Sequence, residues 1–498
     1  MKIEIKDNLS SITTQAGVVF IGVILENIFK YIYNILLARL LGPELVGLYF
    51  LGLIVIGFAA ILGKFGLDAG ILRYASMYKV NNINKAKAIL FKGIRLGICL
   101  SFITSIGILF ASKGIALKLF KNASIINIIQ YLAFSIPLST ILMLALSYFQ
   151  AFRTLKYNVL IQNILQPLSN ILLFVILFYF GLRINAAVFS YLAALLIALW
   201  AAFYFLHKRF KVFAMDKISL LNSHDFLKYS FSMFAILIFN YLYRWIDTLM
   251  LGYFRPTYDV GIYNIALRTS VLCSIFFVPF TSVFSPIVSE LYEKDRIDEL
   301  KHIFKVVTRW LFSLTVPLFL IFSFYANRIL NIFGREFVIG SNAFIILSFS
   351  LLISSATDAI GACILVMLGR TKIIFINMVT LIIISIILNY ILIPKFGILG
   401  AAIVNSLSII LMGLLIILEV RYLYGFHPYS LKFFKPLWAG MVSFCILYLS
   451  KALIVKSPWF ILAQAAFFIF TYMFILGFNE DDKVAVRIIA NRLKLIFT

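Results

Sequence analysis

The chain has 498 residues, of which 63% are apolar and only 13% are charged, and its formal net charge is +24. Soluble domains carry about 25% charged residues, and the mean hydropathy here is +1.03. Long apolar stretches recur from end to end, so no separate soluble domain fits in what remains. The basic residues form no organised face outside the apolar segments, which excludes a nucleic-acid-binding domain. The composition therefore predicts an all-α polytopic membrane protein.

Fourteen apolar segments follow one another along the chain. Each is close to the ~20 residues that a helix needs to cross a bilayer. The first is too long, and too similar to the others, to be a cleaved signal peptide. The expected transmembrane helices lie at 14–38, 46–70, 93–112, 125–150, 158–180, 186–206, 229–252, 260–287, 306–325, 342–368, 373–393, 398–418, 434–453 and 459–478.

The basic residues gather on one side of these segments. The most basic loops, 73–95, 208–228 and 294–309, all fall on the same side as the N-terminus. By the positive-inside rule, we expect both termini in the cytoplasm and the protein in the cell membrane. Topology and contact with anionic lipid headgroups account for most of the basic charge.

The two halves of the chain resemble each other. A single register aligns Lys30 with Arg244 and Gly47 with Gly261, and it continues through later positions. Six predicted helices per repeat make the repeats parallel, with a pseudo-twofold axis along the membrane normal. In the same register of 214 residues Tyr49 pairs with Tyr263, Tyr78 with Tyr292 and Ile83 with Ile297. Matches in a shifted register pair Pro43 with Pro256 after one residue of slip, 153–154 with 370–371 at 217, and 186–187 with 401–402 at 215.

The duplication predicts a domain organisation. We expect two pseudo-symmetric six-helix lobes, a cytoplasmic linker, an additional helix pair and a tail. The tail has apolar residues at helical spacing among basic ones, so it is either an interfacial amphipathic helix or a solvated basic segment. The expected boundaries are 1–206, 207–228, 229–420, 421–478 and 479–498.

Charged and amide side chains recur inside the predicted spans. Each buried charge costs at least ~2.5–3.5 kcal/mol, so such residues mark a cavity, a pair or a boundary. Glu26 and Lys30, like Lys64 and Asp68, are four residues apart and can pair on one helix face. The candidates that could bind a substrate are Lys30, Lys64, Arg244, Arg268, Asn27, Asn34 and Asn240, and those that could orient them or couple transport to an ion are Glu26, Asp68, Asp247 and Asp358.

Two interpretations of these charges remain open. The pairs, including Arg244 with Asp247 three residues on, could staple helices together, or they could line a cavity that attracts an anion. Arg268 has no partner nearby in the sequence, which favours the cavity. Asp358 could bind a coupling cation, line the cavity or pair across helices.

Several kinds of chemistry find no support in the sequence. The four cysteines all lie in predicted spans, and the four histidines lie in loops, far apart in the sequence and without metal-ligand spacing. No phosphate-binding Gly-x-x-x-x-Gly-Lys-Ser/Thr motif occurs. We therefore expect no catalytic residues, no metal and no cofactor. The predicted external loops are short; one of them carries the glycosylation sequon at Asn122, which chance can explain.

The chain resembles the polysaccharide-transporter branch of the multidrug/oligosaccharidyl-lipid/polysaccharide (MOP) exporter superfamily. The strings that carry the resemblance are ILLARLLGPELVGLYFLGL at 35–53, HDFLKYSFSMFAILIFNYLYRWIDTLMLGYF at 224–254, VGIYNIALR at 260–268 and LIPKFGILGAAI at 392–403. The resemblance implies two six-helix lobes around a cleft that opens to alternate faces. It also implies that an isoprenoid (di)phosphate-linked oligosaccharide is flipped outward.

In the related lipid II flippases, basic residues in the first, second and eighth helices line the cavity. Lys30, Lys64 and Arg268 occupy those helices here. Arg244 is a candidate from the internal repeat alone. The resemblance implies a monomer that works with the lipid-linked oligosaccharide, membrane lipids and other glycan-assembly proteins.

Three functions are weighed on these grounds. The first is a lipid-linked oligosaccharide flippase. The alternative is a cation-coupled multidrug antiporter of the same superfamily, in which Glu26, Asp247 or Asp358 would bind the cation. A membrane polymerase or glycosyltransferase would need an interfacial catalytic cluster, and the sequence offers none.

Overall fold

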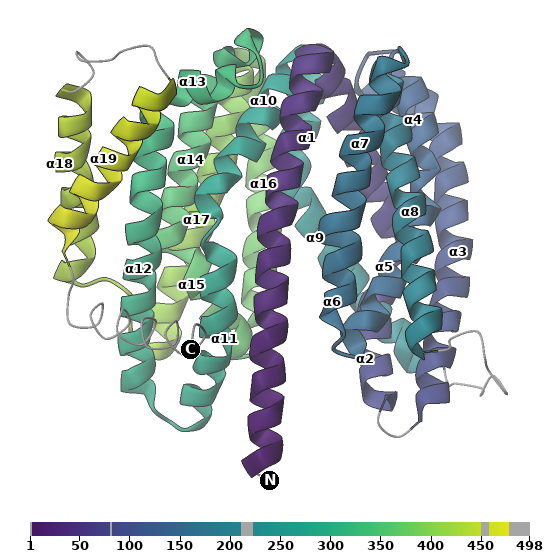
Figure 1. Ribbon diagram of the computed structural model, residues 1–498, viewed down its shortest axis with the longest axis horizontal. Helices are drawn as coiled ribbons and strands as arrows, with labels where there is room; N and C mark the ends of the chain where they lie inside the picture. Colours follow the sequence, from purple (N-terminus) through teal and green to yellow (C-terminus); the bar gives the residue numbers. More distant parts are fainter. Residues whose placement is uncertain (1, 80–81, 211–222, 450–457, 478–498) are drawn as a thin grey trace. The chain divides into compact units, whose positions relative to one another are not determined.

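The computed structural model describes residues 2–79, 82–210, 223–449 and 458–477, with the side chains of the first helix from Ile21 onward. Within these ranges every regular element is a helix and none is a strand (Figure 1). This confirms the predicted fold class of an all-α polytopic membrane protein. The predicted tail at 479–498 and most of the predicted linker lie outside the described residues.

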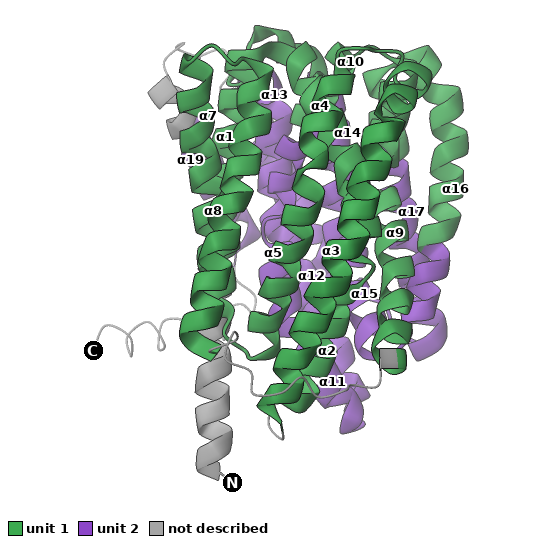
Figure 2. Cartoon of the chain, turned by 90° about the vertical axis from the view of Figure 1, so that its right-hand side faces the viewer, with its two compact units in different colours: residues 1–266, 330–340, 378–404 green, residues 267–329, 341–377, 405–498 purple. Residues whose placement is uncertain are grey.

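The chain divides into two compact units (Figure 2). Unit 1 comprises Met1–Ala266, Leu330–Gly340 and Met378–Val404, and unit 2 comprises Leu267–Ile329, Ser341–Asn377 and Asn405–Thr498. The six-helix lobes expected from the duplication remain a prediction.

The elements that begin in unit 1 come mostly from the N-terminal half of the chain, with two from later segments. They are α1 (Lys2–Lys64), α2 (Leu67–Tyr78), α3 (Ile83–Gly114), η1 (Ile115–Leu119), α4 (Ile125–Ala133), α5 (Ser135–Ala151), α6 (Leu155–Asn158), η2 (Val159–Leu165), α7 (Gln166–Tyr179), α8 (Ile184–Phe210), α9 (Ser223–Phe254), α10 (Thr257–Ser270), η4 (Arg335–Gly340) and α17 (Ile398–Tyr424).

The other elements begin in unit 2. They are η3 (Val271–Ser274), α11 (Phe277–Glu293), α12 (Ile297–Phe324), α13 (Ala326–Asn331), α14 (Ser341–Ala356), α15 (Asp358–Met367), α16 (Thr371–Phe396), η5 (Leu431–Phe434), α18 (Lys435–Leu449) and α19 (Pro458–Leu476).

The described residues contain ten helices long and apolar enough to cross a membrane, or eleven with the bent pair Thr257–Ser274 and Phe277–Glu293. One of the ten, Ile21–Lys64, is 44 residues long. That is about twice the length needed for one crossing, so it covers two of the predicted spans. The predicted count of fourteen is not confirmed. Of two shorter apolar helices, Ala466–Leu476 lies within the span predicted at 459–478, and Asp358–Met367 forms the second part of the span predicted at 342–368.

The division of the first long helix comes from one glycine and one proline. Gly42 has φ 75° and ψ 170°, a conformation outside the helical region, and Pro43 follows it directly. Glycine adopts a positive φ without a steric penalty, and proline is favoured in the first turn of a helix. The backbone therefore kinks at Gly42, between the spans predicted at 14–38 and 46–70.

Two glycines that are equivalent in the repeat lie against each other in unit 1. A Cβ atom on Gly47 would stand 1.8 Å from the carbonyl oxygen of Thr257, and one on Gly261 would stand 1.9 Å from the carbonyl oxygen of Pro43. The register that aligns Gly47 with Gly261 also aligns Pro43 with Thr257, so the two contacts exchange under the repeat. Such a reciprocal contact is what a local twofold axis produces.

The turns that follow α5 and α15 have the same geometry, one residue out of register with the match of 153–154 to 370–371. In both, the second residue after the helix has a positive φ, Arg153 at 55° and Gly369 at 74°. Both turns close with the same pair of backbone hydrogen bonds, the signature of a Schellman cap. These bonds run from Arg153 to Gln150 and from Thr154 to Phe149, and likewise from Gly369 to Val366 and from Arg370 to Leu365.

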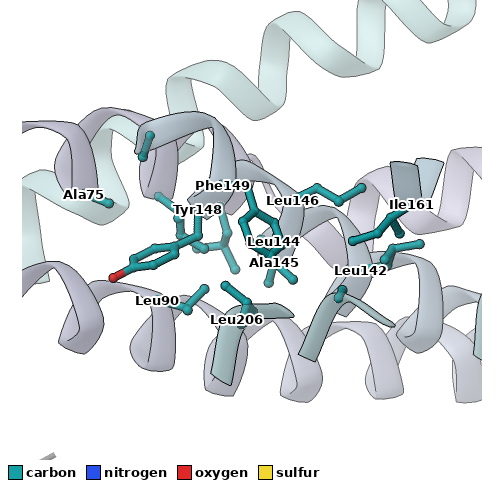
Figure 3. Packing of buried hydrophobic residues seen from close by; sticks show 14 of the residues in the cluster. Ala75, Leu90, Leu142, Leu144, Ala145, Leu146, Tyr148, Phe149, Ile161 and Leu206 are labelled. Atoms are coloured by element: carbon teal, nitrogen blue, oxygen red, sulfur yellow. The ribbon is translucent and has the colours of Figure 1, made fainter. Parts of the chain in front are cut away.

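A buried cluster fixes α2 and α5 with respect to α3 and α8 in unit 1 (Figure 3). Tyr148 and Phe149 of α5 are fully buried in it, beside Leu90 of α3 and Leu206 of α8. Association of helices in lipid depends on close packing rather than on exclusion of water. The cluster therefore packs α2, which carries Asp68, against α3 and α5.

Candidate functional site

The first candidate group lies on α1 before its kink. Glu26 and Lys30 form the predicted i,i+4 ion pair; the Lys30 side chain is 59% exposed and that of Glu26 19%. Asn34, one turn further on, is buried, and Asn27 is half-buried. The Lys30 ammonium is thus held by a carboxylate and still accessible to a ligand.

A residue that sequence reasoning missed completes this group. The Nδ2 atom of Asn163 donates a hydrogen bond to Glu26 Oε2 at 2.6 Å. Asn163 lies in η2, a π-helical stretch of seven residues that precedes Pro167. Such π-helical turns are frequent at functional sites, and here the turn carries the amide that fixes the Glu26 carboxylate. The sequence did contain a signal for this residue: Asn163 lies next to a second amide, Gln162, inside an apolar span, and Pro167 follows four residues later.

The second group spans the break between α1 and α2. Lys64 Nζ lies 2.7 Å from Asp68 Oδ2, and their side chains are 17% and 21% exposed. Phe65 and Gly66 between them have φ values of 50° and 70°, so the pair crosses a turn rather than a continuous helix. The other oxygen, Asp68 Oδ1, is buried and has no hydrogen-bond partner among the described residues.

The third group is on α9. Arg244 is exposed, and its side chain makes no ion pair or hydrogen bond within the described part of the chain. Asn240 is exposed and donates to the carbonyl of Ile236 in its own helix at 3.0 Å. Asp247 is only 3% exposed. Asp247 Oδ1 accepts a hydrogen bond from Asn389 Nδ2 at 2.7 Å, so this carboxylate turns toward α16 in unit 1.

Unit 2 holds the remaining two candidates. Arg268 is half-buried on α10. Asp358 is the first residue of α15, next to Thr357, whose hydroxyl lies 3.3 Å from Asp358 Oδ1. A carboxylate in the first turn is stabilised by the positive end of the helix dipole.

Unit 2 also contains a carboxylate that the sequence analysis did not single out. Glu419 Oε1 accepts a hydrogen bond from Asn377 Nδ2 at 2.7 Å, while Glu419 Oε2 is buried and has no partner among the described residues. The span predicted from the sequence ends at residue 418, one residue before Glu419, so Glu419 was not among the candidate residues.

The repeat-related positions in unit 1 differ in their charge balance. The repeat register aligns Lys30 with Arg244 and Glu26 with Asn240. Lys30 therefore has a carboxylate four residues earlier, whereas Arg244 has a neutral amide. The guanidinium of Arg244 presents its donors in a planar fork that suits a phosphate, and no carboxylate competes for it within hydrogen-bond distance in the described residues. The described part of the chain shows no group of three or more His, Cys, Asp or Glu that could hold a metal.

Comparison with known proteins adds two family matches. The model of the family described as "Polysaccharide biosynthesis protein" matches residues 12–292. The model of the MatE family matches residues 232–391.

Two curated relatives come from Haloferax volcanii. The chain is 25% identical over 409 residues to a "Probable low-salt glycan biosynthesis flippase Agl15", a match that covers 82% of each chain. It is 30% identical over 186 residues to a "Probable flippase AglR", covering 35% of this chain and 37% of the relative.

Two solved structures share the fold. The "Lipid II flippase MurJ, inward closed conformation" has a TM-score of 0.75 and 17% identity, covering 92% of this chain and 98% of the other. An inward-facing multidrug resistance MATE family transporter of the MOP superfamily has a TM-score of 0.69 and 14% identity, covering 80% and 94%. At these identities the likeness establishes the fold alone.

Proposed function

Since the chain belongs to the polysaccharide biosynthesis protein family, we propose that it is a flippase for an isoprenoid phosphate- or diphosphate-linked oligosaccharide. It moves this lipid from the cytoplasmic to the outer leaflet by alternating access, and thereby supplies the assembly of a surface glycan. The two Haloferax relatives named as flippases support the proposal.

One observation about the site carries the proposal. Lys30 and Arg244, two cations at repeat-related positions of membrane helices, are both exposed. A charge within the membrane is costly unless it is paired or lies in a water-filled cavity. Exposed cations on such helices belong in a water-filled cavity that receives an anion. A phosphate linked to an isoprenoid is the anion that a flippase of this family handles.

The candidate residues take distinct roles in this proposal. Lys30, Lys64, Arg244 and Arg268 bind the phosphates, because lysine and arginine make charge-assisted hydrogen bonds to phosphate oxygens. Glu26 and Asp68 orient Lys30 and Lys64 through the ion pairs in the structure. Asn27, Asn34 and Asn240 supply amides for the sugars, and Asp247 and Asp358 are the carboxylates available to a coupling cation.

The membrane potential favours outward movement. With both termini in the cytoplasm of a cell whose interior is negative, a diphosphate that carries about two negative charges gains roughly 4–5 kcal/mol on leaving at about 100 mV, using about 2.3 kcal/mol per charge. The protein works as a monomer in the cell membrane beside other glycan-assembly proteins. No chemical step on the substrate is required of it.

Single alanine variants of Lys30, Arg244 and Arg268 test the site in cells that depend on the protein for their surface glycan. We expect at least one of the three variants to lose the glycan while the protein remains in the membrane fraction. Normal glycan in all three would refute the assignment of phosphate binding to these residues.

The match to the MatE family model over residues 232–391 favours a second candidate function. A cation-coupled multidrug antiporter would use a buried carboxylate such as Asp247, which is 3% exposed and bound by Asn389. The exposed cations Lys30 and Arg244 disfavour a cationic drug in the same space. Drug resistance conferred by overexpression, and lost on Asp247→Asn, would establish the antiporter instead.

A further inference from the structure

The helix α3 in unit 1 has one face that is cationic near its start and apolar further on (Figure 2). Lys92 and Arg95 are three residues apart, which places them on the same face of the helix. Exposed apolar side chains continue this face at helical spacing toward the other end of α3. They are Ile98, Phe102, Ile106 and Phe110, of which Phe110 is 85% exposed.

This face of α3 is open to the membrane. Only 17% of the apolar stretch of the candidate span Ile83–Leu119 is buried. Exposed apolar side chains on a spanning helix contact acyl chains, whereas lysine and arginine near a helix end extend to the headgroups. Acyl chains therefore run along the apolar stripe, and lipid headgroups lie at its cationic end. None of the roles proposed above uses this surface.

The cationic end of the face lacks a negative partner in the neighbouring sequence. Segment 73–95 contains six lysine or arginine residues and no carboxylate. The Arg95 side chain is exposed and makes no ion pair or hydrogen bond within the described residues. Lys85, earlier on α3, lies against a neutral group, with its ammonium 5.8 Å from the ring centroid of Tyr78. The guanidinium of Arg95 thus keeps its donors available to an anion.

The repeat-related helix α12 in unit 2 lacks such a face. The repeat register of 214 residues aligns Lys92 with Val306 and Arg95 with Arg309. Arg309 is only 6% exposed, so α12 presents no exposed cation at either of these two positions. The cationic face of α3 is therefore not a requirement of the repeated fold.

The segments that lead into the two helices differ in charge in the same sense. Segment 287–309, the counterpart of 73–95, contains five cations and five carboxylates. Two exposed ion pairs in it join Lys294 to Glu290 and Arg296 to Glu299. Both segments are expected on the side of the termini, so the positive-inside rule applies equally to them and does not account for the difference. The excess positive charge at α3 indicates an anionic partner from outside the chain.

A membrane lipid fits both parts of this face. Its phosphate oxygens accept charge-assisted hydrogen bonds from lysine and arginine at the cationic end, and its acyl chains cover the apolar stripe. A free phosphate would leave the stripe uncovered, and a soluble acidic protein could not follow the stripe into the hydrocarbon core.

We propose that this face of α3 binds an anionic phospholipid of the surrounding membrane, with its phosphate on Arg95 and Lys92 and its acyl chains along the stripe that begins at Ile98. The site selects a headgroup of net negative charge over a zwitterionic one, since the positive group of a zwitterionic lipid would meet the same two cations. The proposal goes beyond the function proposed above and does not rest on it, because lipid binding is measured without transport.

The test measures which lipids the purified protein retains. The protein is equilibrated in mixed micelles with equal amounts of phosphatidylglycerol and phosphatidylcholine that have identical acyl chains, and the bound lipids are quantified by mass spectrometry. The test variant is Arg95→Gln. The matched control is Lys294→Gln, which removes the same charge from the corresponding segment of unit 2, where the lysine has a carboxylate partner. The measured quantity is the ratio of bound phosphatidylglycerol to bound phosphatidylcholine.

We expect this ratio to fall about fivefold in Arg95→Gln, since one cation at an anionic lipid surface contributes about 1 kcal/mol, and to stay at the wild-type value in Lys294→Gln. Arg95→Lys keeps the charge and should keep most of the preference. An unchanged ratio in Arg95→Gln would overturn the site, and so would an equal fall in both glutamine variants, because net charge alone would then explain the preference. If an isoprenoid phosphate displaces phosphatidylglycerol from the wild type at a much lower concentration, the face belongs to the transported lipid and the proposal fails.

Discussion

The contact between Gly47 and Gly261 gives a sharp prediction about stability. In Gly47→Ala the new Cβ would stand 1.8 Å from the Thr257 oxygen and 2.9 Å from the Gly261 nitrogen. Both are backbone atoms, so no side-chain rotation relieves the clash. A Cβ contact below 3.0 Å is essentially never seen, so the two backbone segments must move apart to admit the methyl group.

The size of the effect follows from two opposing contributions. Forced overpacking costs about 1–3 kcal/mol, and a clash with backbone falls in the upper part of that range. Because alanine has a higher helix propensity than glycine, the substitution also stabilises the helix by about 1 kcal/mol. We therefore expect Gly47→Ala to lower the free energy of unfolding by about 1–2 kcal/mol.

The matched control is Gly107→Ala in α3, because a Cβ at Gly107 has no atom within 4 Å. This variant should be as stable as wild type or up to about 1 kcal/mol more stable. The assay is reversible unfolding in mixed micelles, followed by intrinsic fluorescence. If Gly47→Ala and Gly107→Ala were equally stable, the close approach of the backbone at Gly47 to the backbone at Thr257 would be refuted.

Further predictions concern the pairs that hold unit 1 together. Asp247→Ala leaves the Asn389 amide buried without its acceptor, so it should cost about 1–3 kcal/mol of stability in the same unfolding assay, and a neutral result would contradict that contact. Tyr241→Phe removes the hydrogen bond of 2.7 Å to the carbonyl of Ile54 and should cost about 0.5–1.5 kcal/mol, with Tyr390→Phe, whose side chain is 66% exposed, as the unaffected control. Asn163→Ala should weaken transport several-fold with little change in stability, since it frees the Glu26 carboxylate; transport at the wild-type rate would remove Asn163 from the site.

Contacts between residues four apart in the sequence could be predicted, even where the helix breaks between Lys64 and Asp68. The spacing of four residues between Glu26 and Lys30, and between Lys64 and Asp68, predicted two ion pairs that the structure confirms. The same reasoning cannot rank a local partner against a distant one. Asp247, three residues from Arg244, is buried against Asn389, 142 residues away, because the approach of α16 offers an amide inside the protein. The roles of these residues in transport stay predictions.

The helical character of the chain followed from its hydropathy, whereas the breaks inside helices did not. The span predicted at 342–368 is divided at Thr357, and the one at 260–287 bends by 45° near residue 275. Asn27, Asn34 and Asn240 were singled out because charged residues lie in the same predicted spans, whereas the spans that hold Asn163 and Asn389 contain no charged residue. The importance of Asn163 and Asn389 lies in the carboxylates that they bind, which only the packing of helices reveals.

The measurement that tests the central claim most directly is the flipping of a fluorescent isoprenoid-diphosphate oligosaccharide in proteoliposomes, comparing wild type with Lys30→Ala/Arg244→Ala. Two lost charge-assisted hydrogen bonds of about 1.5 kcal/mol each predict a transport rate lower by about 100-fold. A double variant that flips this lipid at the wild-type rate would contradict a phosphate site formed by these two cations.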